Sequence, residues 1–370
     1  MKNTKGQWKA MMVFALFTGV LLSAGTVKAS TVKINDKNFP DIYFQEYVSA
    51  AFDKNEDGSL SDSEREAVTE LDVGDTSEYQ LTYEYLPIQT LKGIEYFSNI
   101  ETLNCSYNAL DELDVSSLKK LSELRCNENQ LKALHLSGNR ELRYLYCQDN
   151  SIKRLSCSNN KKLRELYCDR NQLKKLDISS NKKLRVLSVA GNKLKKINVR
   201  KQKQLTKLYV NDNKLVGLDL SHNPNIISLY ASNNKLQKLS LRKNRKLDFL
   251  SCSYNRLRKL NLKSNKLLRY LYCRNNQLVT GNLYISRQGL EAVDVSGQSK
   301  SVRAGKTKKG YRISLAGIQK TNVLTKLSAG KVTDKGIVLK GKKLPSKITY
   351  RYNMFMDGNT KETVTLYLKK

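Results

Sequence analysis

Apolar residues recur along the chain with a period of 21, in nine uninterrupted copies from residue 100 to residue 288. Each copy follows LxxLx(C/V)xxNxLxxLx(L/V/I)SxNxx, which puts apolar side chains at positions 1, 4, 6, 11, 14 and 16. One such unit cannot bury these side chains alone, whereas stacked units form a continuous core. The pattern predicts a solenoid with a short strand around positions 4 to 6, where side chain 5 points outward. A second strand or extended segment is expected around positions 14 to 16.

Asparagine occupies position 9 in all nine copies and recurs at position 19, where Leu118 and Gln202 interrupt it. Buried amides need hydrogen-bond partners, so both columns are interpreted as structural. Six of the seven cysteines lie at position 6 and Cys157 at position 16, where other copies carry Val, Ile, Leu or Ala. We therefore expect free thiols in the core, and neither disulfides nor a zinc site.

Copies such as LRELYCDRNQLKKLDISSNKK (163–183), preceded by LKGIEYFSNIETLNC (91–105), resemble bacterial secreted leucine-rich repeat proteins. The closer resemblance is to the 21-residue cysteine-ladder subclass, of internalin J type. It implies an α/β-type solenoid dominated by β structure: a right-handed coil of short parallel strands with a small helical N-terminal cap. It also implies recognition of a protein or glycan, with adhesion among the roles. No wall-sorting signal of the LPxTG kind is found, and the flanks differ from typical internalin flanks.

The sequence divides into four parts. Residues 1–29 have the basic start, short apolar stretch and small-residue cleavage site of a secretory signal, and the apolar stretch is too short for a membrane anchor. Residues 30–75 form the expected helical cap, and 76–298 the repeats. In 299–370, YRISLAG, KVTDKGIVLKG, KITYRYN and TVTLYLK predict about four antiparallel strands of a β-rich cap. A carbohydrate- or wall-binding module is the alternative for this last part.

Within the N-terminal cap, residues 53–64 match the calcium-loop pattern D-x-[DN]-x-[DN]-G-x5-E of EF-hands, between helices expected at 42–52 and 62–71. Calcium prefers a cage of hard oxygen ligands. The candidate ligands for a structural Ca²⁺ are Asp53, Asn55, Asp57, Ser59, Ser61 and Glu64. Only one copy of the motif is present, although such loops usually occur in pairs, and the alternative is an acidic turn.

Charge is distributed unevenly, which indicates two modules with different surroundings. Residues 30–99 carry 15 acidic and 5 basic side chains, a net charge of −10, whereas 100–370 carry 19 and 57, a net charge of +38. Basic pairs recur at positions 12 and 13, and they could hold an anionic wall polymer or simply keep the surface solvated. The candidate polyanion-binding residues are Lys153, Arg154, Lys174, Lys175, Lys195, Lys196, Arg258 and Lys259.

Aromatic residues concentrate on the outward face of the predicted strands. Tyrosine is a good strand residue, but it is also favoured in binding sites because it offers a large contact area at low entropic cost. The candidate ligand-binding residues at positions 3 and 5 are Tyr144, Tyr146, Tyr167, Tyr209, Tyr230, Phe249, Tyr270 and Tyr272.

No catalytic constellation is found, since the two histidines occupy unrelated repeat positions and the cysteines belong to the core. The sequence therefore predicts a non-enzymatic protein that is secreted or associated with the cell surface. We expect its partner to be an extracellular protein or glycan, with no nucleic acid and no membrane span. The alternative is a wall-associated structural protein held by an anionic polymer of the teichoic acid kind.

Overall fold

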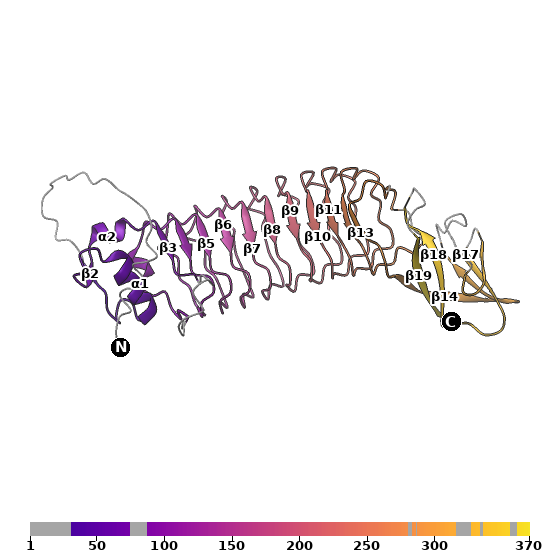
Figure 1. Ribbon diagram of the computed structural model, residues 1–370, viewed down its shortest axis with the longest axis horizontal. Helices are drawn as coiled ribbons and strands as arrows, with labels where there is room; N and C mark the ends of the chain where they lie inside the picture. The colour runs from indigo at the N-terminus through magenta and orange to yellow at the C-terminus, as the bar shows by residue number, and fades with distance from the viewer. Residues whose placement is uncertain are drawn as a thin grey trace. The chain divides into compact units, whose positions relative to one another are not determined.

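The computed structural model describes residues 31–74, 87–279, 283–285, 287–315, 327–333, 336–355 and 361–370 (Figure 1). The predicted signal segment, 1–29, lies outside the described residues. The chain divides into two compact units, one ending at Leu173 and the other beginning at Lys174. In the described part of the chain, no helix is both long enough and apolar enough to cross a membrane.

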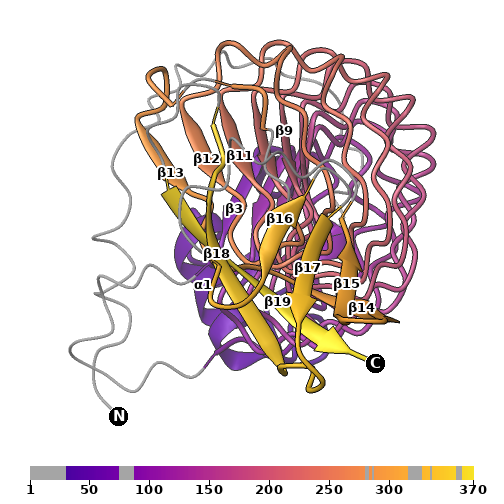
Figure 2. The ribbon, with the colours of Figure 1, turned by 90° about the vertical axis from the view of Figure 1, so that its right-hand side faces the viewer.

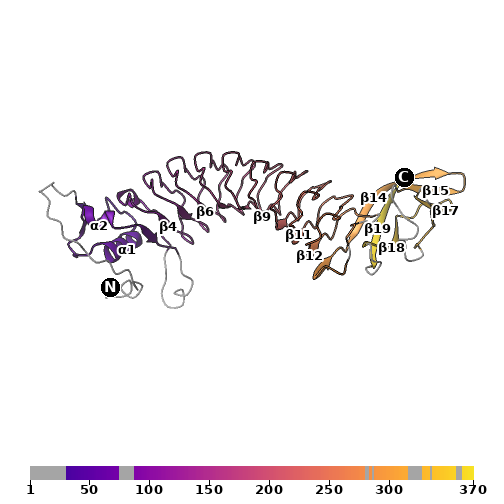
Figure 3. The ribbon, with the colours of Figure 1, turned by 90° about the horizontal axis from the view of Figure 1, so that it is seen from above.

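The first unit begins with the cap, in which β1 (Val32–Lys33) and β2 (Ser59–Leu60) form an antiparallel pair. The helices α1 (Ile42–Phe52) and α2 (Asp62–Glu66) belong to the same cap (Figure 3). Asp41 caps α1, because its carboxylate accepts the N–H groups of the first turn and so satisfies donors that have no partner within the helix. The same carboxylate accepts the Gln89 N–H at 2.7 Å. One side chain thus starts the helix and holds the segment that leads into the repeats.

A short 3₁₀ helix, η3 (Ile94–Tyr96), precedes the nine copies of the repeat. Five parallel strands of the first unit pair in register, leucine beside leucine. They are β3 (Glu70–Asp72), β4 (Thr102–Asn104), β5 (Glu123–Arg125), β6 (Tyr144–Tyr146) and β7 (Glu165–Tyr167).

The strands occupy repeat positions 3 to 5, so each cysteine at position 6 follows its strand directly. The helix predicted over 62–71 ends at Glu66, and β3 lies inside the range assigned to the cap. The physical reason is burial: Leu71 is fully buried and pairs with Leu103, as leucines do between the following strands of this unit.

The second unit contains six parallel strands of the same repeat, also paired leucine to leucine up to the last, where Leu271 meets Val293. These strands are β8 (Val186–Ser188), β9 (Lys207–Tyr209), β10 (Ser228–Tyr230), β11 (Phe249–Ser251), β12 (Tyr270–Tyr272) and β13 (Ala292–Asp294). The segment at positions 14 to 16 is extended, and among the described residues it forms only an isolated bridge, between Leu134 and Leu155.

Both asparagine columns are structural, as predicted. Asn213 shows the bonding at position 9: its Nδ2 donates to the carbonyl of Val189 in the preceding coil at 2.8 Å, and its Oδ1 accepts the Leu194 N–H at 2.9 Å. In the position 19 column, Gln202 is fully buried and its Nε2 donates to the Ile178 carbonyl at 2.7 Å. Gln202 therefore continues the hydrogen-bonded column at position 19, although the sequence pattern indicated an interruption at this residue.

All seven cysteines are free and fully buried, as predicted. Burial raises the pKa of the Cys157 and Cys252 thiols to about 12, because the thiolate would lose its hydration in the apolar interior. These thiols are core side chains without the environment of a reactive nucleophile.

Position 8 has a left-handed backbone in every one of the nine copies, with φ between 46° and 62°. One copy uses glycine there, Gly191, and the other copies use larger residues. L-residues adopt this region at a cost, so the turn after each strand is imposed by the stacking of the coils. The positions are Tyr107, Glu128, Asp149, Arg170, Gly191, Asp212, Asn233, Tyr254 and Asn275.

The C-terminal part of the second unit is a six-stranded sheet of order β16-β17-β15-β14-β19-β18 (Figure 2). Its strands are β14 (Gln298–Thr307), β15 (Gly310–Ser314), β16 (Lys331–Thr333), β17 (Gly336–Lys340), β18 (Lys347–Asn353) and β19 (Lys361–Lys369). Every pairing is antiparallel except β14 with β19. The sequence pattern missed β14, because its residues are mostly polar.

Several hydrogen bonds join this sheet to the last coils. Gln298, at the start of β14, takes over the position 9 role: its Nε2 donates to the Cys273 carbonyl at 2.9 Å and its Oε1 accepts the Leu278 N–H at 3.1 Å. The buried Tyr350 hydroxyl donates to the Val279 carbonyl at 2.5 Å. The sheet thus covers the end of the repeats, which otherwise would leave apolar side chains exposed to solvent.

Candidate functional site

Aromatic rings of β9 to β12 form a continuous stack on the outward face of the second unit's sheet. The Tyr209 and Tyr230 ring centroids lie 4.6 Å apart with nearly parallel planes, and Tyr230 lies 4.4 Å from Phe249. Phe249 in turn contacts Tyr270 at 5.9 Å and Tyr272 at 5.6 Å. We call these five residues the aromatic stack. Each is half-buried, since its neighbours cover the ring faces and leave the outer edge to solvent.

The stack exists because strands pair in register, so that position 5 of one coil lies directly beside position 5 of the next. At β11 that position is Ser251, which would leave a gap in a single column of rings. Phe249, at position 3 of the same strand, bridges the gap by contacting Tyr230 on one side and Tyr272 on the other. The two sequence columns therefore form one surface.

A smaller aromatic pair lies on the first unit's sheet. Tyr146 and Tyr167 stack with centroids 5.1 Å apart, and the Arg125 guanidinium lies 5.0 Å from the Tyr146 centroid, on its face. Partial burial raises the pKa of the Tyr146 hydroxyl. Tyr144 is half-buried on the same strand, beside Tyr146. All eight aromatic residues predicted from the sequence thus lie on strand faces, in two groups.

Charged side chains border the aromatic stack at β12. Arg269 pairs with Asp248 at 2.6 Å and with Glu291 at 3.1 Å, and its guanidinium lies 5.3 Å from the Tyr270 centroid. The Tyr270 hydroxyl hydrogen-bonds to Glu291, which raises the pKa of the tyrosine and lowers the pKa of the carboxyl. This edge offers fixed charges of both signs beside apolar rings, an arrangement suited to recognising a polar partner.

Tyr254, which was not among the residues predicted from the sequence, is 47% exposed at position 8, close to the strand face. The Arg274 guanidinium lies 5.4 Å from its ring centroid. The signal in the sequence is a bulky aromatic residue at position 8, which is not one of the apolar core positions of the repeat.

The basic pairs at positions 12 and 13 lie on exposed surface outside the strands. Each of the eight predicted side chains is exposed: Lys153, Arg154, Lys174, Lys175, Lys195, Lys196, Arg258 and Lys259. They do not form one column in the second unit, because Val216 and Gly217 occupy these positions in the coil of residues 205–225. Where the pairs resume, further cations lie beside them in the coils of residues 226–246 and 247–267.

The predicted calcium loop folds around Asp53, which is 7% exposed. The Asp53 carboxylate accepts the Asp57 N–H at 3.2 Å and the Gly58 N–H at 3.0 Å, so it shapes the loop from within. Ser59 lies in β2, whose antiparallel partner is β1, so β1 occupies the place that a second loop's strand would take.

The Glu64 carboxylate accepts the N–H groups of Lys54 at 2.7 Å and Ser61 at 2.8 Å. Partial desolvation opposes its ionisation, but the hydrogen bonds from Ser61 and Lys54 outweigh it and lower the pKa of this carboxyl. Elsewhere in the loop, Asn55 Nδ2 donates to the Asp57 carboxylate at 2.9 Å. Among the described residues, no three His, Cys, Asp or Glu side chains gather closely enough to form a metal site. The six predicted ligands lie along the segment from the end of α1 to α2, and the carboxylates of Asp53, Asp57 and Glu64 accept hydrogen bonds within it.

No protein-family model and no curated protein matches the chain. Solved structures do. The chain is similar to the functional domain of InlJ from Listeria monocytogenes, which includes a cysteine ladder, with a TM-score of 0.59 and 21% identity over 93% of this chain and 100% of that chain. It is also similar to the internalin InlF from Listeria monocytogenes strain 4b F2365, with a TM-score of 0.56 and 22% identity over 75% of this chain and 87% of that one. Together with the stacked coils, these likenesses show that the chain has the leucine-rich repeat fold with a cysteine ladder.

Proposed function

We propose that the protein is a non-enzymatic binding protein, secreted or held at the cell surface, that recognises an extracellular protein or glycan with its strand face. The aromatic stack carries this proposal. Five half-exposed rings in continuous contact, on a parallel sheet with fixed register, present a large surface whose side chains are already ordered. Ordering before binding reduces the entropic cost of association.

The test measures capture of extracellular surface proteins and glycans by immobilised protein, with and without two substitutions in the stack, Tyr209→Ala and Tyr230→Ala. We expect the double variant to lose at least tenfold in affinity, because each stacked aromatic contributes about 1 kcal/mol or more at an interface. Tyr367→Ala is the matched control, since Tyr367 is a 50% exposed tyrosine in the C-terminal sheet. Equal affinities of the double variant and the control would refute a strand-face site.

Salt separates this proposal from the second candidate, a wall-associated protein held by an anionic polymer. Contacts made by aromatic rings persist at high ionic strength, whereas polyanion binding weakens steeply as salt rises. The second candidate is supported by the net charge of +38 over residues 100–370 and by the exposed basic pairs. At about 0.5 M salt, interactions between surface charges are strongly screened. Retention of the natural partner at this salt concentration therefore supports binding by the strand face.

For the cap, we propose a structural Ca²⁺ in the loop of residues 53–64. The donor set supports it, because Asp53, Asn55, Asp57 and Glu64 offer hard oxygens at the spacing of a calcium loop. The antiparallel pairing of β2 with β1 supports a single loop, since β1 supplies the strand that a second loop would otherwise provide. Calcium would then stabilise the cap that covers the first coil.

The measurement is thermal unfolding in millimolar calcium and in EGTA. We expect a higher midpoint with calcium, and no such difference in the Asp53→Asn, Glu64→Gln variant. A midpoint that does not change with calcium would contradict a structural ion.

A further inference from the structure

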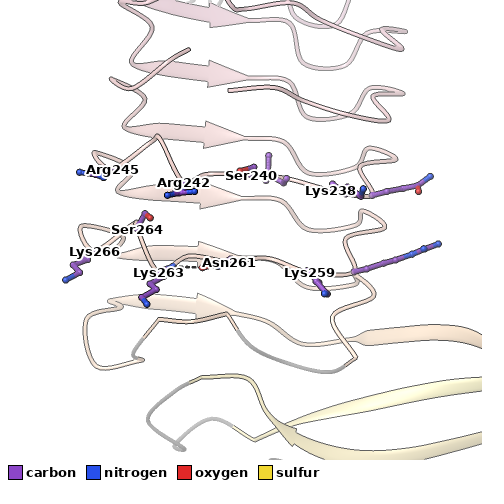
Figure 4. A pocket seen from close by; sticks show the side chains of 12 residues that line it. Lys238, Ser240, Arg242, Arg245, Lys259, Asn261, Lys263, Ser264 and Lys266 are labelled. Carbon is purple, nitrogen blue, oxygen red and sulfur yellow. Dashed lines mark hydrogen bonds between the residues drawn. The ribbon is translucent and has the colours of Figure 1, made fainter. Parts of the chain in front are cut away.

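A basic groove of about 1050 Å³ lies between two successive coils of the second unit, outside the strands (Figure 4). Lys238, Arg242 and Arg245 reach it from the coil of residues 226–246. Four more cations, Arg258, Lys259, Lys263 and Lys266, reach it from the coil of residues 247–267. Among the described residues, its lining contains no acidic side chain and no aromatic ring.

The groove is basic because position 17 departs from the serine consensus in both coils, while position 15 carries no acidic residue in either. Position 17 is serine in most coils, but here it is Arg242 and Lys263. Position 15 is aspartate in several coils, as in Asp219, whereas here it is the neutral Ser240 and Asn261. These two coils therefore gain cations and lack the carboxylate that Asp114, Asp177 and Asp219 supply elsewhere.

The seven cations remain available for a ligand. Among the described residues, none of them forms a salt bridge within 4.0 Å, in contrast to Arg200, which lies 3.9 Å from Asp219. Seven like charges within one concave surface repel one another, and a bound polyanion would remove that repulsion. Arginine and lysine are also the side chains that bind phosphate and sulfate oxygens most strongly.

The neutral side chains of the lining indicate which kind of polymer would carry the anionic groups. Gln237, Ser240, Asn261 and Ser264 offer amides and hydroxyls that match a chain rich in hydroxyl groups. Single-stranded nucleic acids are usually held by stacking of their bases on aromatic side chains, and this groove has none. We propose that the groove binds a linear polymer of sugar or polyol units carrying phosphate or sulfate esters. This site is separate from the strand face on which the proposed function rests.

The experiment uses two fluorescent probes of similar length, a sulfated heparin hexasaccharide and a glycerol phosphate oligomer, and measures anisotropy with the full chain at about 0.1 M salt, where the Debye length is about 10 Å. Binding of either probe supports the proposal, and the preferred probe identifies sulfate or phosphate as the source. We expect the affinity to fall steeply as salt rises, as it does when several charged contacts form together.

The decisive variant is Ser240→Asp with Asn261→Asp, which restores the carboxylate found at position 15 in other coils and so preserves the coil. We expect it to weaken probe binding at least tenfold. The control variant is Lys342→Gln with Lys343→Gln in the C-terminal part, which changes the net charge by the same two units. We expect it to weaken probe binding less than threefold. Equal losses of probe affinity in both variants would overturn the proposed groove site, because the overall positive charge of the chain would then explain the binding.

Two further outcomes also decide against the proposal. Failure of both probes to bind the native chain at low salt would overturn it, and so would equally tight binding of an oligothymidine of the same length. The groove variant should retain the strand-face binding proposed above, so the loss of one activity without the other distinguishes the two proposals. Thermal unfolding of each variant confirms that the coil is intact.

Discussion

The backbone of the repeat is strained at position 8, where the residue has a left-handed conformation. Tyr107 has φ of 57° and is 53% exposed, so its side chain contributes little packing while its backbone N–H donates to the Asn127 carbonyl at 3.0 Å. The conformation is therefore maintained by the neighbouring coil and is not intrinsic to tyrosine.

We predict that Tyr107→Val lowers the free energy of unfolding by about 1–2 kcal/mol, because β-branched residues tolerate the left-handed region worst. Tyr107→Gly should leave stability unchanged or raise it slightly, since glycine adopts this conformation without strain. Urea unfolding of the two variants measures the difference. Equal stabilities of the valine and glycine variants would mean that the backbone conformation is not the controlling factor.

The buried thiols give a pH dependence of known sign. Burial raises the pKa of Cys252 to about 12 from its ordinary value of 9.0, so the unfolded chain ionises first as the pH rises. The stability contributed by the buried, protonated thiol is present in full below pH 9. It is lost progressively as the pH rises to about 12.

We predict that stability declines as the pH rises above 9, and that the seven cysteines resist iodoacetamide at pH 8 until the protein unfolds. Mass spectrometry of the labelled chain counts the modified thiols. Rapid labelling of the native protein would contradict the buried ladder.

At the scale of elements, the position 9 ladder and the final sheet meet at the last coil. Gln298 ends the ladder, and the Tyr350 hydroxyl donates to the Val279 carbonyl from a ring that is 2% exposed. A buried carbonyl without its donor costs about 1–3 kcal/mol.

We predict that Tyr350→Phe destabilises the junction between sheet and coil by about that amount, and that amides of the last coil lose protection against hydrogen exchange. Tyr367→Phe is the control, because Tyr367 lies on the same sheet but is 50% exposed. An unchanged exchange pattern in Tyr350→Phe would show that packing alone holds the sheet.

At the scale of the whole molecule, the main feature is the large excess of positive charge. The net charge of +38 over residues 100–370 means that cations far outnumber carboxylates, and exposed ion pairs such as Lys162–Glu141 add little to stability. Repulsion among like charges destabilises a compact state, and salt screens it.

We predict that the melting midpoint rises between about 20 and 200 mM sodium chloride at neutral pH, as the Debye length falls below about 10 Å. Differential scanning calorimetry measures it, and Lys342→Gln with Lys343→Gln should reduce the salt dependence. A midpoint that falls with salt would indicate that favourable ion pairs outweigh the repulsion.

Much of this protein follows from its sequence alone, because the 21-residue period fixes which side chains are inward in every coil. The repeat alone assigns Leu145 to the core, Cys147 to the thiol column and Asn150 to the ladder, since each residue type recurs at one position. Helix α1 was predicted at its observed bounds from the amphipathic pattern of residues 42–52, and Asp41 supplies the acceptor at its start.

Tertiary structure decided what the period does not encode. The polar β14 is a strand only because it pairs with β19 and because Gln298 completes the ladder. Phe249 bridges the aromatic stack because its ring, at position 3, reaches Tyr230 and Tyr272 at position 5 of the two neighbouring coils. The basic groove likewise needs two neighbouring coils to depart from the consensus together. A repeat pattern specifies how each coil folds, whereas contacts between unlike residues of adjacent coils depend on distances that only the stacked chain defines.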